Sequence, residues 1–245
     1  MVDFYLKKTI IRRWSFLLCL LLSSGCQPAS VSPKPTIFCA ASLSHVLREC
    51  LQQTKLEASV QSGGSTVLVT QVKAGAKADI LLLADVRLLA QIPEHTILRS
   101  ETLASNELVV IRPKSATEGS PSDWREPQTR LALANPKTAP LGRYTEQALA
   151  HSASESQRVF AKDAVAVVTA VALGHADFGI VYKTDAIKSS AVEIVSTFTP
   201  ESYDTIEYQI VLLQPGKAAA EEIYNSMTSQ TGRSILKDNG FALLQ

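Results

Sequence analysis

Short apolar runs alternate with helical segments twice along this chain of 245 residues. The first set has apolar runs at 36–40 and 80–84, a further expected strand at about 56–60, and helical patterns at 43–51 and 67–73. Buried strands that alternate with helices are typical of parallel sheets covered by helices. The alternation therefore predicts the α/β fold class.

A second set follows a polar segment at 114–129, which is rich in Ser, Pro and Glu. It contains apolar runs at 131–134 and 178–182, with helical patterns at 141–150 and 163–173. Each set has too few strands for one large sheet, so we predict two lobes.

The lobe boundaries follow from two apolar runs, 107–111 and 207–213, which we interpret as crossings between the lobes. Lobe 1 is then expected to comprise 36–108 and 208–245. Lobe 2 is expected to comprise 109–207.

Residues 1–25 have the pattern of a secretory signal peptide. Basic residues precede the apolar run 14–22, which is too short for a comfortable transmembrane helix. Small residues then lead to Cys26, as in a bacterial lipobox, although Ser23 stands where Leu is usual. We predict a lipid on Cys26, a flexible tether at 26–35 and a location in the periplasm or cell envelope, anchored to the membrane. Cleavage without lipid attachment is the alternative.

The net charge of +1, with no Lys/Arg run outside the N-terminus, argues against a nucleic-acid partner. Cys39 and Cys50 fall in an expected buried strand and the helix after it, so we interpret them as small buried side chains rather than a disulfide. The cysteine spacing predicts no metal site and no cofactor.

Four turns between expected strands and helices carry uncharged hydrogen-bond donors. Ser42 and Tyr182 each follow or end a buried strand, and two further turns lie at 62–66 and 139–142. Donor-rich turns at helix N-termini suit a small anion held by neutral hydrogen bonds. Taken alone, such a serine is more often a helix cap and such a tyrosine a core aromatic.

Charged residues beside these turns have a structural interpretation. We expect Asp79 and Asp85 to act in turns or caps, and Arg143 and Lys183 to be solvated residues at the rim of the site.

Six motifs occur in a fixed order after about residue 35. They are Ala40-Ala41-Ser42-Leu43, Ser62-Gly63-Gly64-Ser65-Thr66, Ala74-Gly75-Ala76-Lys77-Ala78-Asp79-Ile80 with Ala84-Asp85, Ala139-Pro140-Leu141-Gly142-Arg143-Tyr144, Asp163-Ala164-Val165, and Gly179-Ile180-Val181-Tyr182-Lys183-Thr184-Asp185-Ala186. With this order and spacing the chain resembles the periplasmic molybdate/tungstate-binding proteins, which are the solute-binding components of ABC importers.

The resemblance implies a two-lobed type II periplasmic-binding-protein fold with the ligand in the cleft. It implies direct oxyanion contacts from Ser42 and Ser65 of lobe 1. Lobe 2 would add the backbone N–H groups of Leu141 and Ala164 and the hydroxyl of Tyr182. It further implies a monomer without enzymatic activity that binds molybdate or tungstate and delivers it to an ABC permease.

Three departures from the family pattern bear on the shape of the cavity. Leu141 stands where a smaller residue is more common, Gly63 and Gly64 replace a Ser-rich turn, and Asp163 puts a carboxylate beside a contact.

Other functions remain as alternatives. Molybdate and tungstate only accept hydrogen bonds, whereas phosphate keeps a proton that Asp163 or Asp185 can accept. Sulfate is acceptor-only but smaller, so sulfate or phosphate binding is one alternative, and a ligand-sensing domain is another. A serine nucleophile with His45, His95, His151 or His175 as base is disfavoured, because Gly-x-Ser-x-Gly is absent and no His lies in these turns.

Overall fold

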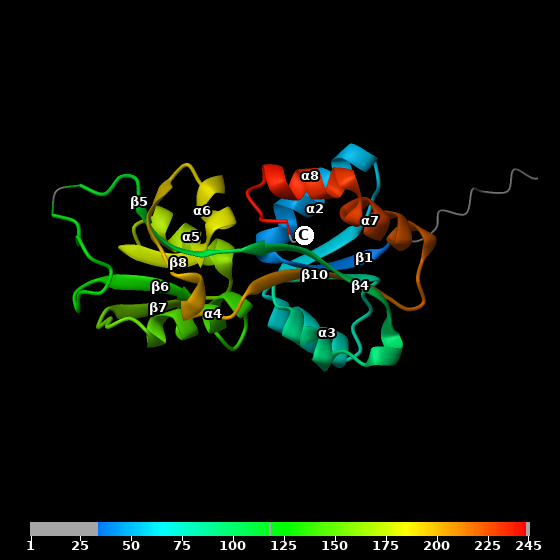
Figure 1. The fold of residues 1–245 in the computed structure, drawn as a ribbon, viewed down its shortest axis with the longest axis horizontal. Coiled ribbons are helices and arrows are strands. Elements are labelled where there is room, and N and C mark those ends of the chain that lie inside the picture. The colour runs from blue at the N-terminus through cyan, green and yellow to red at the C-terminus, as the bar shows by residue number, and fades with distance from the viewer. Residues whose placement is uncertain (1–33, 118, 244–245) are drawn as a thin grey trace, which may run out of the picture. The chain divides into compact units, whose positions relative to one another are not determined.

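The computed structural model of the chain describes residues 34–117 and 119–243. The predicted signal peptide, Cys26 and most of the tether lie outside these residues. The described residues form two mixed five-stranded sheets with helices on both faces, so the predicted two-lobed α/β fold is confirmed (Figure 1). No helix in the described ranges is long and apolar enough to span a membrane.

The first sheet has the strand order β2-β1-β3-β10-β4, in which β1 pairs in parallel with β2 and β3, and β10 is antiparallel to β3 and β4. Its elements are β1 (Thr36–Ala40), η1 (Ala41–Leu43), α2 (Ser44–Thr54), β2 (Ser59–Gly63), α3 (Ser65–Lys73), β3 (Ile80–Leu83), η2 (Val86–Gln91), η3 (Glu94–Thr96), β4 (Ile97–Asn106), β10 (Ile206–Leu213), α7 (Ala218–Thr228) and α8 (Gln230–Asp238).

The second sheet has the order β7-β6-β8-β5-β9, in which β6 pairs in parallel with β7 and β8, and β5 is antiparallel to β8 and β9. Its elements are β5 (Leu108–Pro113), β6 (Arg130–Ala134), α4 (Pro140–Ala150), β7 (Gln157–Ala161), α5 (Ala164–Ala172), β8 (Phe178–Tyr182), α6 (Lys183–Lys188), β9 (Val192–Thr197) and η4 (Pro200–Ser202).

The chain passes between the sheets twice, after β4 and after β9. Asn106 secures the first passage, because its Nδ2 donates to Thr184 Oγ1 at 2.8 Å and to the Tyr208 hydroxyl at 3.1 Å. The strands that precede the two passages, β4 and β9, are edge strands, and each is antiparallel to its neighbour. The lobe boundaries at 108/109 and 207/208 stay predictions.

Alternate residues of each central strand pack on opposite faces of the sheet, as the pleat requires. In β3, Ile80 and Leu82 pack in the cluster with α2, α7 and α8, whereas Leu81 and Leu83 pack in the cluster with α3 and η2. Helices α2 and α3 therefore lie on opposite faces of the first sheet. Cys39 and Cys50 are buried and free, and burial raises the pKa of the Cys39 thiol to about 12.

Three strands differ from the sequence prediction. Strand β2 begins later than expected, because Leu56 closes the end of α2: Lys55 is left-handed (φ 57°) and the Leu56 N–H donates to Leu51 O at 3.2 Å. Strands β4 and β7 were not predicted. Strand β7 lies at a sheet edge and is largely exposed, so it lacks the apolar run of a buried strand.

Candidate functional site

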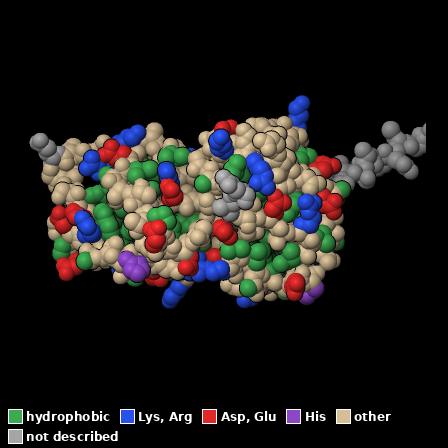
Figure 2. Space-filling view, in the orientation of Figure 1, with side chains coloured by type: hydrophobic (Ala, Val, Ile, Leu, Met, Phe, Trp, Pro, Cys, Tyr) green, Lys and Arg blue, Asp and Glu red, His purple; other side chains and the backbone are tan. Residues whose placement is uncertain are grey.

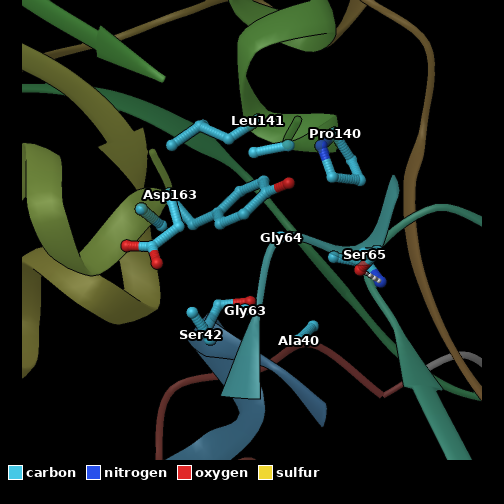
Figure 3. A pocket seen from close by; sticks show the side chains of 13 residues that line it. Ala40, Ser42, Gly63, Gly64, Ser65, Pro140, Leu141 and Asp163 are labelled. Atoms are coloured by element: carbon cyan, nitrogen blue, oxygen red, sulfur yellow. Dashed lines mark hydrogen bonds between the residues drawn. The ribbon is translucent and has the colours of Figure 1, made fainter. Parts of the chain in front are cut away.

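A small pocket lies where the ends of several strands from both lobes meet the N-termini of the following helices (Figure 3). Its cavity volume of about 20 Å³ slightly exceeds the ~10–15 Å³ that one water needs, so it suits a ligand of few atoms. The lining residues are Ala40, Ala41, Ser42, Gly63, Gly64, Ser65, Ala84, Ala139, Pro140, Leu141, Asp163, Ala164 and Tyr182.

The structure brings all five predicted contact residues to this pocket: Ser42, Ser65, Leu141, Ala164 and Tyr182. Figure 3 shows Pro140 and Leu141 on one side, Ser42 and Ala40 on the opposite side, and Ser65 and Asp163 at the two flanks. The two lobes therefore contribute opposing walls.

Ser65 is the first residue of α3 and is buried. Its Oγ accepts a hydrogen bond from the Ala84 backbone N–H at 3.0 Å, drawn as a dashed line in Figure 3. An oxygen whose lone pair is occupied in this way keeps its own proton for another acceptor. Ser65 is thus oriented as a donor.

Ser42 lies in η1, directly after β1, and is also buried. It lines the small pocket from the side of the first lobe.

Tyr182 ends β8, and only 1% of its surface is exposed. Its ring meets the ring of Tyr208 edge-on, with centroids 5.8 Å apart. Burial raises the pKa of Tyr182 well above its ordinary value, so the hydroxyl keeps its proton. That hydroxyl has no hydrogen-bond partner among the described residues, although a buried polar group normally has one.

Leu141 and Ala164 belong to the first turns of α4 and α5, where backbone N–H groups have no acceptor within the helix. The positive end of the helix dipole adds to this preference for an anion. Gly142 permits the close approach of α4 to β6, because a Cβ there would lie 2.3 Å from the Ala134 carbonyl oxygen.

Asp163 is the N-cap of α5, since its Oδ1 accepts from the Ala166 N–H at 2.9 Å. Its carboxylate occupies the flank of the pocket opposite Ser65 (Figure 3). A capping role explains why a carboxylate is retained beside an otherwise donor-rich site.

The lobes approach each other closely beside the pocket. An ideal Cβ on Gly64 would lie 2.1 Å from the carbonyl oxygen of Thr138 in the other lobe. Within the departure from the family pattern at 63 and 64, Gly64 thus has a steric reason, because only glycine permits this approach.

Arg143 is not the solvated rim residue that the sequence suggested. Its guanidinium donates to the buried Asp85 carboxylate at 2.9 and 3.2 Å, and to Asp204 at 3.1 Å. Asp85 is a cap, as expected, and accepts from the Arg87 N–H at 3.1 Å. Lys183 is exposed and pairs with Glu107 at 2.8 Å. Neither lysine nor arginine lines the pocket itself.

A comparison with family models matches residues 35–242 to the model described as bacterial extracellular solute-binding protein. The chain belongs to this family. It is therefore a binding protein and not an enzyme, as predicted from the sequence.

Curated relatives of this solute-binding protein are themselves named as binding proteins. It is 28% identical over 229 residues to the molybdate-binding protein ModA of Escherichia coli K12, covering 86% of this chain and 89% of the relative. It is 28% identical over 247 residues to the putative ABC transporter substrate-binding lipoprotein YvgL of Bacillus subtilis, covering 92% and 95%.

Solved structures share the fold. The periplasmic molybdate-binding protein of Azotobacter vinelandii matches with a TM-score of 0.73 and 24% identity, over 86% of this chain and all of that one. The sulfate-binding protein SubI of Mycobacterium tuberculosis matches with a TM-score of 0.69 and 14% identity, over 86% and 87%. The two-lobed fold thus carries proteins named for different oxyanions, and the ligand has to be argued from the site.

Proposed function

We propose that this protein captures molybdate or tungstate outside the cytoplasm and delivers it to an ABC transporter. The observation that carries the proposal is the buried Tyr182 hydroxyl, a donor without a partner among the described residues, at a pocket with Ser42, Ser65, Leu141 and Ala164. These five residues offer hydrogen-bond donors, and a fully deprotonated dianion accepts without donating.

The energetics of such a site are sufficient for capture. A hydrogen bond to a charged group contributes about 1.5–3 kcal/mol net, so five of them contribute on the order of 10 kcal/mol. Closure of the lobes and ordering of the ligand offset part of this gain. A dissociation constant between micromolar and nanomolar follows, since 1 µM corresponds to about −8 kcal/mol.

The names of the relatives support the choice of ligand and of partner. Several are molybdate-binding proteins, and one is an ABC transporter substrate-binding lipoprotein. We extend the lipoprotein assignment to Cys26, which lies outside the described residues. Mass spectrometry of the membrane fraction should find acyl chains on Cys26; an unmodified mature chain in the soluble fraction would contradict the anchor.

Calorimetric titration with molybdate, tungstate, sulfate and phosphate tests the proposed ligand. We expect one-to-one binding of molybdate and tungstate and far weaker binding of sulfate and phosphate. Equal or tighter binding of sulfate would assign the site to a smaller acceptor-only anion. Tighter phosphate binding would assign the acceptor role to Asp163.

A further inference from the structure

A second, larger cavity opens beside the small pocket and shares Ala41 and Ser42 with it. We call it the outer pocket, and its volume is about 380 Å³. Its lining includes Ser42, Arg48, Asp185 and Lys188. Helix α2 of the first lobe forms one wall, and α5 with α6 of the second lobe forms the other.

The charges on these walls favour an anion. Arg48 and Lys188 come from opposite lobes, and no carboxylate lies within ion-pair distance of either one in the described part of the chain. Glu49, the neighbour of Arg48, accepts instead from Asn239 Nδ2 at 2.9 Å. By contrast, each arginine next to the small pocket is neutralised by Asp85 or Asp204.

A buried carboxyl belongs to the lining of the same cavity. Asp185 lines the outer pocket with only 8% of its surface exposed, and its Oδ2 has no hydrogen-bond partner among the described residues. Burial raises the pKa of this carboxyl to about 7, so near neutral pH a large fraction is protonated and uncharged. Asp185 thus adds little negative charge to a space that Arg48 and Lys188 also line.

We propose that the outer pocket is a transient binding site for the oxyanion, through which the ligand enters and leaves the small pocket. The inference rests on the proposed function, since it needs an oxyanion that binds the small pocket. Ser42 lines both pockets and so lies where they meet. Arg48 and Lys188 can replace part of the water shell of the dianion before it enters the small pocket. The dianion then loses its hydration in steps.

Local charge, and not net charge, has to provide the attraction. The chain carries a net charge of only +1, and Figure 2 shows acidic and basic side chains interspersed over the face drawn. Cations at a cleft focus the field and raise association rates, and salt weakens this effect. Arg48 and Lys188 lie outside the small pocket, so they should act on the rate of association more than on the bound state.

The test compares rates with affinities for the full protein. Dissociation of radioactive tungstate is followed after adding excess unlabelled tungstate, calorimetry gives the dissociation constant, and their ratio gives the association rate constant. We expect Arg48→Gln and Lys188→Gln each to lower the association rate constant about three- to tenfold at low salt. The affinity should fall less, and high salt should remove most of the difference from the parent.

Lys73→Gln is the matched control, because it removes the same charge from α3, on the opposite face of the first sheet. An equal effect of Lys73→Gln, or unchanged association rates in both outer-pocket variants, would overturn the entry site while leaving the proposed function intact. A loss of affinity with unchanged association rates would also overturn it, because the two cations would then act on the bound state. Absence of any oxyanion binding by the parent would overturn both proposals.

Discussion

Arg143 of α4 and Asp85 after β3 form an ion pair that joins the two lobes, with Nη2 2.9 Å from Oδ2. The carboxylate is almost fully buried, and Arg87 holds its other oxygen from within the first lobe. Asp204, in the passage between β9 and β10, accepts from both arginines and from Gln147 at 2.8 Å. One contact between the lobes is therefore made of paired charges and lies outside the small pocket.

Arg143→Gln should weaken oxyanion binding by about 1–2 kcal/mol, roughly 5- to 30-fold. The reason is that the hydrogen bonds from Arg143 to the Asp85 carboxylate form only when the lobes are together, so their loss disfavours the closed state that binds the ligand. Each lobe should still fold, since Arg87 continues to pair with Asp85. Calorimetry measures the affinity, and small-angle scattering should show a larger radius of gyration for the ligand-free variant than for the parent.

Arg112→Gln is the control, because Arg112 pairs with Glu193 between two strands of the same sheet. It should leave affinity and radius unchanged. If Arg143→Gln binds as tightly as Arg112→Gln, the ion pair with Asp85 does not contribute to closure.

Gly64→Ala should lower affinity more than tenfold without unfolding either lobe. The backbone of Gly64 (φ −67°, ψ 132°) suits any residue, so the substitution adds no local strain. Its Cβ, however, would collide with the Thr138 carbonyl in the other lobe. Gly63→Ala is the neighbouring control, since its Cβ would meet only Leu68 at an ordinary 3.7 Å. Equal affinities of the two variants, measured by calorimetry, would mean that the lobes can bind ligand without this approach.

Local sequence patterns were sufficient to predict the buried strands at the sheet centres and the turns that contain Ser42, Ser65 and Tyr182. Strand β6 after Arg130 and strand β8 are buried runs without polar side chains before Tyr182. Ser42 and Tyr182 lie at the ends of buried strands, whereas Ser65 lies in a Gly-rich turn after the exposed strand β2, so each pattern is contained in a few consecutive residues. The family resemblance added Leu141 and Ala164. Their proposed contacts are backbone N–H groups, which every residue except proline has, so the residue type does not identify them.

Contacts between distant segments could not be predicted in the same way. Arg143 and Asp85 are 58 residues apart, and neither has a local pattern that identifies the other as its partner. The outer pocket combines Arg48 and Lys188 from different lobes, so it exists only once both sheets have formed. Strand β7 escaped prediction for another reason, because an exposed edge strand needs no apolar alternation.

Tyr182→Phe should have opposite effects on binding and on ligand-free stability. Loss of the donor should weaken binding by about 1–3 kcal/mol. Without ligand, the variant should be at least as stable as the parent, because a buried hydroxyl without a partner among the described residues is removed. Thermal unfolding with and without molybdate measures both effects.

Ser65→Ala provides the contrast, because it leaves the Ala84 N–H without its acceptor and should lower both affinity and ligand-free stability. A loss of ligand-free stability in Tyr182→Phe that matches the loss in Ser65→Ala would show that the Tyr182 hydroxyl has a structural role. Unchanged molybdate affinity in both variants would remove these two residues from the site.

Asp185→Asn should change how stability depends on pH. Burial raises the pKa of Asp185 from an ordinary 3.8 to about 7; Asp163 adds to the rise and Lys188 opposes it. Between about pH 4 and pH 7 the folded state thus holds a proton that the unfolded state has released. The free energy of unfolding should fall as pH rises through this window, by up to about 4 kcal/mol, and then stay level.

Denaturant unfolding at pH 4, 5.5, 7 and 8 measures this slope. Asp185→Asn should flatten it and be more stable than the parent at pH 8, because no buried charge has to form. Asp177→Asn is the control of opposite sign: hydrogen bonds from Arg130 lower the pKa of Asp177, so its stabilising effect is present at neutral pH and is lost as pH falls. A parent whose stability rises from pH 5.5 to pH 8, with no difference in Asp185→Asn, would show that the Asp185 carboxylate is solvated or paired in the folded protein.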